Sequence, residues 1–260
     1  MRHRLAGAID GGPRVPFEAI LFDKDGTLFD FHASWGGWTR GFLLEVSEGD
    51  AARARGLGEV IGYDFDSGRF APGSVVVAGT NADIADLLAR ELGRADAERL
   101  IGRLAEAALS VPMVEAVALR PLLSELRARG LSLGLATNDN EAPARAHLEA
   151  AGLSDLFDFI AGYDSGHGGK PAPGMLLAFA RAMGIAPERC LMVGDSRHDL
   201  VAGRAAGMGT VAVLTGPSPR EELEPFADAV LPDIGHLPAW LDAVNGESAG
   251  PPAGKGRKAK

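Results

Sequence analysis

Short apolar runs alternate with helical patterns along most of the chain, and this alternation limits the folds that the sequence can adopt. Five runs have the length and flanks of strands buried on both faces of a sheet: 17–22, 131–136, 157–161, 190–193 and 210–214. Helical patterns lie between them at 121–129, 142–151, 173–183 and 200–206, and a glycine follows each one. Because strand and helix in alternation build parallel sheets, we expect an α/β fold with a Rossmann-like, doubly wound parallel sheet.

One interval breaks this rhythm. Roughly a hundred residues separate the first expected strand from the second, whereas a crossover with its helix needs only about a dozen. The interval contains helical patterns at 82–92 and 96–109 and a patch rich in Gly, Asp and aromatic residues at 62–74. We therefore expect an N-terminal tail at 1–14, a core formed by 15–32 and 119–245, an inserted helical cap at 33–118 and a disordered basic tail at 246–260.

Composition excludes several classes of protein. The chain has 260 residues, a single cysteine and a net charge of -9. One cysteine cannot build a thiolate zinc or iron–sulfur site, and an acidic chain with scattered basic residues does not suit nucleic acid. No stretch reaches the length of a signal peptide or of a bilayer span. We expect a cytoplasmic protein that binds neither nucleic acid nor membrane and is a monomer or a small homo-oligomer.

Polar side chains follow four of the expected strands at the point where each strand ends. Ligands of an open parallel sheet bind just beyond these carboxyl ends, so the residues there are the first candidates for chemistry. Alone, each one is typical of a turn, a helix cap or a solvated surface. Their coincidence at matching strand ends favours one functional site, made of Asp23 and Asp25, Thr137 and Asn138, Lys170, and Asp195 and Asp199.

This set of residues constrains the chemistry. Several carboxylates that meet without nearby His or Cys suit a hard cation, so we expect Mg²⁺ as the cofactor. A carboxylate ionised at neutral pH can attack phosphorus and form an aspartyl phosphate, while a lysine and the metal neutralise the phosphoryl oxygens. A second carboxyl group two residues along the chain can protonate the leaving oxygen and then activate water.

Four segments carry a family resemblance. The sequences LFDKDGTLFD, LATND, GGKPAPG and VGDSRHDL resemble, in order, the four signature motifs of the haloacid dehalogenase (HAD) superfamily. The resemblance covers about residues 16–235, and within the superfamily the chain is most similar to phosphoglycolate phosphatase-type hydrolases. Those proteins carry a helical cap after the first motif, which agrees with the insertion expected from spacing.

The resemblance implies roles for five residues. Asp23 matches the nucleophile and Asp25 the general acid/base, and the superfamily's dehalogenases lack this second aspartate. Thr137 matches the hydroxyl that binds the phosphoryl group, with Asn138 beside it. Lys170 matches the cation that orients the nucleophile and binds substrate.

The resemblance also implies a metal shell. Asp195 matches a direct Mg²⁺ ligand, joined by the Asp23 carboxylate and the Asp25 backbone carbonyl, and Asp199 matches the acidic residue that completes the shell through water. Two positions depart from the pattern: Lys24 stands where an apolar residue is common, and Gly174 stands where Asp is common. Neither is a catalytic position, but both weaken the assignment of a named substrate.

Together these observations predict a Mg²⁺-dependent phosphatase that hydrolyses a small phosphorylated metabolite, a phosphomonoester of the phosphoglycolate or sugar-phosphate type, through an aspartyl phosphate. One alternative is a phosphomutase on the same core. Another is a non-hydrolytic receiver-type module that carries a phosphorylated aspartate, although receivers carry that aspartate after the third strand.

Other residues have weaker signals. His32, His167 and His198 could lie near the site, although they lack ligand spacing. We expect Arg69 to be a surface arginine, and the alternative is that it binds a carboxylate or phosphate of the substrate. Trp35 and Trp38 are expected to pack at the hinge or in the cap.

Overall fold

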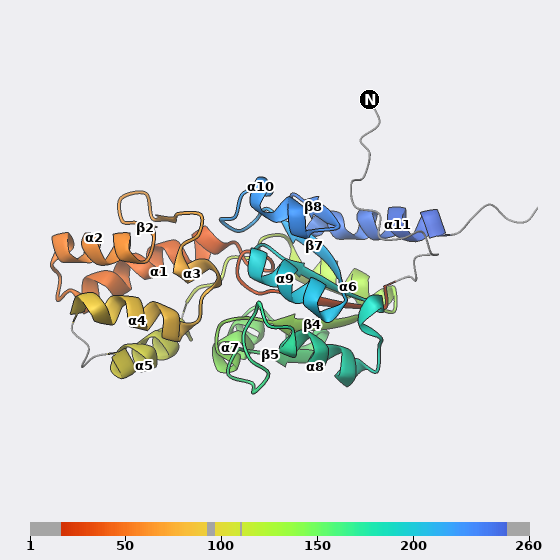
Figure 1. Ribbon diagram of the computed structural model, residues 1–260, viewed down its shortest axis with the longest axis horizontal. Coiled ribbons are helices and arrows are strands. Elements are labelled where there is room, and N and C mark those ends of the chain that lie inside the picture. Colours follow the sequence, from red (N-terminus) through yellow and green to blue (C-terminus); the bar gives the residue numbers. More distant parts are fainter. Residues whose placement is uncertain (1–16, 93–96, 110, 249–260) are drawn as a thin grey trace, which may run out of the picture.

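The computed structural model describes residues 17–92, 97–109 and 111–248, and shows two lobes, a helical one and one built on a sheet (Figure 1). The sheet has six parallel strands in the order β5-β4-β1-β6-β7-β8. Their bounds are β1 Ala19–Phe22, β4 Ser132–Ala136, β5 Phe159–Ala161, β6 Cys190–Gly194, β7 Gly209–Val213 and β8 Ala229–Leu231. The expected doubly wound parallel sheet is confirmed.

Both faces of the sheet are buried, which explains the unbroken apolar character of its strands. Alternate side chains of β1 point to opposite faces: Ile20 and Phe22 join one apolar cluster, and Ala19 and Leu21 join the other. The first cluster is covered by α6 (Leu119–Ala128), α7 (Glu141–Ala150) and α11 (Leu237–Ser248). The second is covered by α8 (Gly174–Met183) and α9 (Arg197–Ala206).

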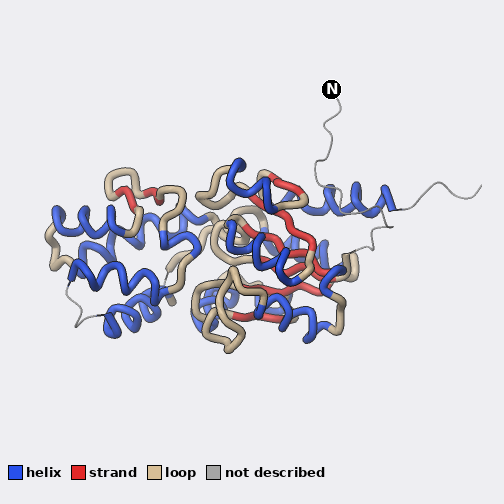
Figure 2. Tube along the Cα trace, viewed as in Figure 1, coloured by secondary structure: helices blue, strands red, loops and turns tan. Residues whose placement is uncertain are grey.

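The inserted segment folds as the helical lobe, drawn on the left of Figures 1 and 2. Its elements are α1 Phe31–Val46, α2 Ala51–Val60, β2 Tyr63–Asp64, β3 Arg69–Phe70, α3 Val75–Ala78, α4 Asn81–Leu92 and α5 Ala97–Ala108. They enclose a third apolar cluster, to which α1 contributes Phe31, Phe42 and Leu43. The Gly/Asp/aromatic patch at 62–74 contains the β2-β3 hairpin and ends at Ser74, the N-cap of α3.

Two short segments lie side by side where the cap joins the sheet lobe. The Asp30 N–H donates to the Val114 carbonyl at 2.8 Å, and the Ala116 N–H donates to the Leu28 carbonyl at 2.9 Å. The Asp30 side chain also caps α1 by accepting from the Ala33 N–H at 2.8 Å. The first helix of the cap is therefore fixed directly to the loop that follows β1.

The remaining elements are short helices and turns. They are the 3₁₀ helices Ser154–Leu156, Pro187–Arg189, Glu224–Phe226 and Ile234–His236 and the helix α10, Arg220–Leu223. Helix α11 continues to Ser248, and the rest of the expected basic tail, like the expected tail at 1–14, lies outside the described residues. Within the described part of the chain, no helix is both long enough and apolar enough to cross a bilayer.

Close packing against the sheet predicts the effect of one substitution. A Cβ added at Gly134 of β4 would lie 2.7 Å from the Phe179 ring and 2.8 Å from Leu21 Cδ1. We expect Gly134→Ala to lower the free energy of unfolding by about 1–3 kcal/mol, because both neighbours are fully buried.

Urea unfolding tests this prediction, with Gly56→Ala as the matched control. Gly56 is exposed in α2 and an added Cβ meets nothing within 4 Å, so that substitution should be neutral or stabilising by about 0.5–1 kcal/mol. Equal stability of the Gly134→Ala protein and the wild type would contradict the packing described here.

Candidate active site

The expected site residues meet at the carboxyl ends of the sheet strands. Asp23 directly follows β1, and its N–H still donates to the Val193 carbonyl of β6 at 2.9 Å. Thr137 directly follows β4, and Asp195 directly follows β6. Lys170 reaches the same point from the loop after β5, where its ammonium group donates to the Ala136 carbonyl at 2.8 Å. The backbone of the central strands thus fixes the positions of these side chains.

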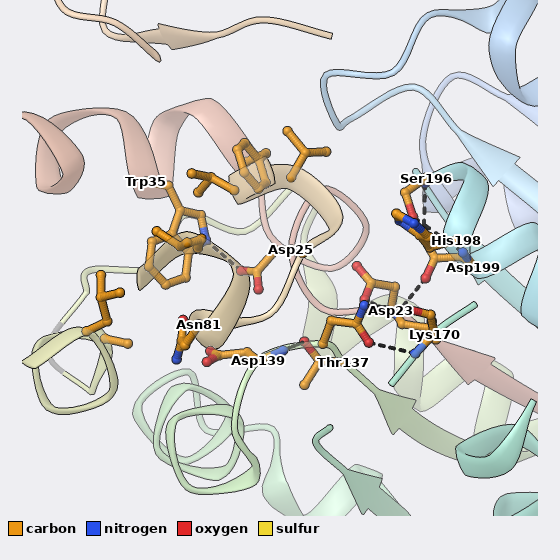
Figure 3. Close-up of a pocket in the computed structure, with 18 of the residues that line it drawn as sticks. Asp23, Asp25, Trp35, Asn81, Thr137, Asp139, Lys170, Ser196, His198 and Asp199 are labelled. Atoms are coloured by element: carbon orange, nitrogen blue, oxygen red, sulfur yellow. Dashed lines mark hydrogen bonds and ion pairs between the residues drawn. The ribbon is translucent and has the colours of Figure 1, made fainter. Parts of the chain in front are cut away.

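Three carboxylates form a buried acidic cluster. Asp23, Asp195 and Asp199 each offer an oxygen within 4.8 Å of the others, and all three residues are buried. Lys170 Nζ lies 2.5 Å from Asp23 Oδ1 and 2.5 Å from Asp199 Oδ1 (Figure 3). Three carboxyl groups therefore face one ammonium group in this cluster.

Burial and these neighbouring charges shift the pKa values of the groups in the cluster. Burial raises the pKa of Asp23 to about 7, and although Lys170 opposes the shift, Asp199 and Asp25 add to it. Burial and the neighbouring Asp23 raise the pKa of Asp195 well above its usual range. Burial alone would lower the pKa of Lys170, but Asp199 and Asp23 outweigh it and hold the lysine in its charged form. A further cation would offset the excess negative charge.

The surroundings of Asp195 fit such a cation. Among the described residues, Asp195 Oδ2 is buried without a hydrogen-bond partner. A Cβ at Gly216 would lie 1.6 Å from this oxygen and a Cβ at Gly26 would lie 2.3 Å from it, so only glycine fits at these positions. Gly26 also has a φ of 83°, which favours glycine. Carboxylate oxygens around this point are the donors that Mg²⁺ prefers.

Hydrogen bonds hold the loops that carry these groups. Asn138 bonds the backbone of Lys170 twice, donating from Nδ2 to its carbonyl at 2.9 Å and accepting its N–H at 2.8 Å. Asp199 accepts from both the N–H and the hydroxyl of Ser196, at 3.0 and 2.6 Å, in the capping box that starts α9. The Thr137 hydroxyl accepts the Asp139 N–H at 3.1 Å.

Asp25 lies apart from the acidic cluster and points toward the cap (Figure 3). Its Oδ1 accepts the indole N–H of Trp35 at 2.7 Å, and its Oδ2 lies 3.0 Å from Lys24 Nζ. Trp35 belongs to α1, so a cap helix directly contacts the second aspartate. From the sequence we expected Trp35 to pack at the hinge or in the cap, and no sequence pattern predicted this hydrogen bond.

Lys24 is a buried charge beside the site that sequence reasoning did not identify. It is fully buried, its Nζ lies 2.9 Å from Asp139 Oδ2, and it sits over the Trp35 ring at 5.4 Å from the ring centroid. Burial alone would lower the pKa of Lys24, but Asp139 and Asp25 together raise it, so the side chain is charged. An ion pair over 115 positions of sequence leaves no local pattern from which it could be found.

The same buried lysine reaches a histidine. Lys24 Nζ lies 3.0 Å from Nδ1 of His147 in α7, and His147 Nε2 lies 2.8 Å from the carbonyl of Ala108 in α5. A carbonyl only accepts, so Nε2 donates to it and Nδ1 accepts from the lysine. His147 is therefore neutral and connects the sheet lobe to the cap.

A cavity lies between the acidic cluster and the cap. All the expected site residues line it except Asp195, which is buried. His198 also lines it, whereas His167 is exposed and His32 instead accepts the Phe70 N–H inside the cap. Arg69 is exposed and borders a different hollow on the cap, so the expectation of a surface arginine is confirmed.

Comparisons with known proteins agree with this geometry. The family described as haloacid dehalogenase-like hydrolases matches residues 17–207. The chain is 35% identical over 230 residues to a phosphoglycolate phosphatase of Rhodospirillum rubrum, an alignment that covers 86% of this chain and 90% of that protein.

Solved structures show the same fold. A HAD family hydrolase of Deinococcus radiodurans with bound phosphate and sodium has a TM-score of 0.62 and 25% identity, covering 88% of this chain and 97% of that one. A β-phosphoglucomutase of Clostridium difficile has a TM-score of 0.58 and 20% identity, covering 89% and 98%. At this identity, the second likeness concerns the fold alone.

The acidic cluster predicts stabilisation by Mg²⁺. A ligand that binds only the folded state at about 100 times its dissociation constant adds about 2.7 kcal/mol, so saturating Mg²⁺ should raise the Tm by several degrees. Asp195→Asn should abolish the rise, whereas Asp86→Asn, an exposed position in α4, should keep it. Thermal unfolding with Mg²⁺ and with EDTA measures the effect, and an unchanged rise in the Asp195→Asn protein would contradict the assignment.

His147 predicts a pH dependence of stability. Burial, followed by the charge of Lys24, lowers the pKa of His147 from its ordinary 6.5. Below about pH 6.5 the unfolded chain therefore takes up a proton that the folded chain does not, and stability falls by up to about 1.4 kcal/mol per pH unit.

Comparing variants isolates this contribution. His147→Gln removes the titrating ring, so its free energy of unfolding should fall less between about pH 7 and pH 5 than that of the wild type. His236→Gln, at an exposed residue, should behave like the wild type. Urea unfolding at each pH gives the comparison, and parallel curves for His147→Gln and the wild type would show that His147 does not titrate as described.

Proposed function

Since this chain belongs to the haloacid dehalogenase-like hydrolase family and is a phosphoric monoester hydrolase, we propose that it cleaves a small phosphomonoester with Mg²⁺ through an aspartyl phosphate on Asp23. One observation carries the proposal. Two carboxylates, Asp23 and Asp25, line one cavity but have different partners, since Asp23 meets Lys170 and Asp25 meets the cap. A nucleophile and a proton carrier need this separation.

In the first step, an Asp23 carboxylate oxygen attacks phosphorus. The bond between phosphorus and the alcohol oxygen breaks, and Asp25 gives its proton to that oxygen, so the alcohol leaves neutral. Lys170 keeps Asp23 oriented through their 2.5 Å contact, and the Thr137 hydroxyl and Asn138 bind the phosphoryl oxygens. The negative charge that develops on these oxygens faces the Lys170 ammonium group.

In the second step, Asp25 takes a proton from water and the resulting hydroxide attacks the phosphorus of the aspartyl phosphate. The bond between phosphorus and the Asp23 oxygen breaks, which releases inorganic phosphate and restores the Asp23 carboxylate. The Trp35 indole N–H and the Lys24 ammonium group hold the Asp25 side chain in one position for both proton transfers.

Mg²⁺ would be held by the Asp23 and Asp195 carboxylates and the Asp25 backbone carbonyl, with Asp199 completing the shell through water. When bound, it supplies positive charge that neutralises the phosphoryl oxygens and reduces the repulsion between the buried carboxylates. The orphan oxygen Asp195 Oδ2 supports this assignment.

We also propose that residues 15–32 and 119–245 form the catalytic core and that the cap, at 33–118, covers the site. The cap contacts the site through Trp35 and through the Ala108 carbonyl. A covered site excludes bulk water while the aspartyl phosphate exists. Membership in a hydrolase family argues against the receiver-type module.

Phosphate release tests the proposal. A panel of esters, including p-nitrophenyl phosphate, phosphoglycolate and sugar phosphates, should give Mg²⁺-dependent release that EDTA abolishes. Asp23→Asn should lower kcat at least about a thousandfold, because it removes the nucleophile. The exposed Asp86→Asn should leave kcat unchanged.

Two results would contradict the proposal. Release that Asp23→Asn leaves intact would exclude the aspartyl phosphate on that residue. Turnover of a sugar phosphate that needs a catalytic amount of its bisphosphate, with transfer back to sugar instead of release, would favour the phosphomutase.

A further inference from the structure

The cavity above Asp23 has two chemically different walls. The wall from the sheet lobe is polar, whereas the wall from the cap is apolar. Among the described cap residues that line the cavity, Asn81 alone has a polar side chain that is not aromatic. The apolar wall is formed mainly by Phe31, Trp38, Val77, Ile84 and Leu104.

Positive charge is confined to the polar wall. Of the described residues that line the cavity, Lys170 is the only lysine or arginine, and its ammonium group already contacts Asp23 and Asp199 at 2.5 Å. None of the described cap arginines lines the cavity, and two of them pair elsewhere, Arg55 with Asp66 and Arg103 with Glu45. Among the described residues, a second anionic group on a substrate therefore finds no lysine or arginine on the cap side.

The cap side is equally poor in groups for hydroxyls. The Asn81 amide already donates from Nδ2 to Asn140 Oδ1 at 2.9 Å. The indole N–H of Trp35 donates to Asp25. Hydroxyl groups that lose their water against this wall gain few hydrogen bonds in return, which disfavours a polyhydroxylated leaving group.

We infer that the substrate is the phosphomonoester of an uncharged, apolar alcohol, whose hydrocarbon part packs against Phe31, Trp38, Val77, Ile84 and Leu104. This inference rests on the proposed function, because it assumes that the phosphoryl group lies at Asp23. The cap then discriminates against phosphoglycolate, whose carboxylate would be buried without a partner and close to Asp25 and Asp139.

A pair of esters of similar size isolates this charge. Isobutyl phosphate and phosphoglycolate are both phosphate esters of a primary alcohol. The carbon next to the CH2–O group carries two methyl groups in isobutyl phosphate and two carboxylate oxygens in phosphoglycolate. With Mg²⁺ present, kcat/KM should be at least about tenfold higher for isobutyl phosphate, and benzyl phosphate should exceed both, because burial of each methylene strengthens binding about fourfold.

A substitution in the apolar wall should weaken the preference. Val77 is only partly buried, so a lysine there is tolerated better than at Leu104. Val77→Lys supplies the missing cation, and the ratio of kcat/KM for isobutyl phosphate to that for phosphoglycolate should fall at least about tenfold. Val60→Lys, at a position 38% exposed at the end of α2, should keep the wild-type ratio.

The outcomes distinguish a failure of this inference from a failure of the proposed function. Equal or higher kcat/KM for phosphoglycolate in the wild type, with release still dependent on Asp23, would overturn the apolar substrate class and leave the phosphatase intact. Asp23-dependent release from none of the esters would overturn both. The wild-type comparison needs no variant, so misfolding of Val77→Lys would not affect it.

Discussion

Burial of like charges at the end of a parallel sheet is the constraint on which this structure depends. Asp23, Asp195 and Asp199 lie together because the carboxyl ends of β1 and β6 and the start of α9 meet at one edge of the sheet. Each of the three is nearly inaccessible to water. Burial raises the pKa of Asp23, the charges of Asp199 and Asp25 add to this shift, and Lys170 only partly offsets it. Buried carboxylates with shifted pKa values are typical of functional sites, and under the proposed function this cluster binds a cation and the negative oxygens of a phosphoryl group.

A second buried charge connects this chemistry to the cap. Lys24 contacts Asp25, Asp139 and His147 together, and His147 in turn donates to a carbonyl of α5. Trp35 of α1 also binds Asp25, so the cap contacts this network at two points, through Trp35 and through the α5 carbonyl. The position of Asp25, the proposed proton carrier, is therefore set by cap and core jointly, whereas the position of Asp23, the proposed nucleophile, depends on the core alone.

The sequence predicted the sheet well and the cap in part, for physical reasons. In the cap, the expected helices at 82–92 and 96–109 correspond to α4 and α5. Five of the six strands in the sheet were found because both faces are buried, while β8 is short and only half-buried. Helix α1 was missed because Gly36, Gly37 and Gly41 weaken its helical signal, and packing within the cap stabilises it instead.

The site also contains residues that the sequence predicted and contacts that it did not. Its strand-end residues could be predicted, since parallel strands bring their carboxyl ends together. The contacts of Lys24 with Asp139 and His147 could not, because they join segments more than a hundred positions apart in sequence. The bond from Trp35 to Asp25 spans few positions but depends on how the cap packs against the sheet lobe. The apolar wall of the cavity likewise comes from four cap helices, α1, α3, α4 and α5, whose facing side chains no local pattern identifies.

The stereochemical course at phosphorus tests the central claim, which is that Asp23 carries the phosphoryl group between alcohol and water. An isotopically chiral thiophosphate ester, hydrolysed in isotopically labelled water, yields chiral inorganic thiophosphate whose configuration can be determined. Two successive in-line displacements, first by Asp23 and then by water, predict overall retention of configuration. Inversion would show that water attacks the ester directly and would contradict the account.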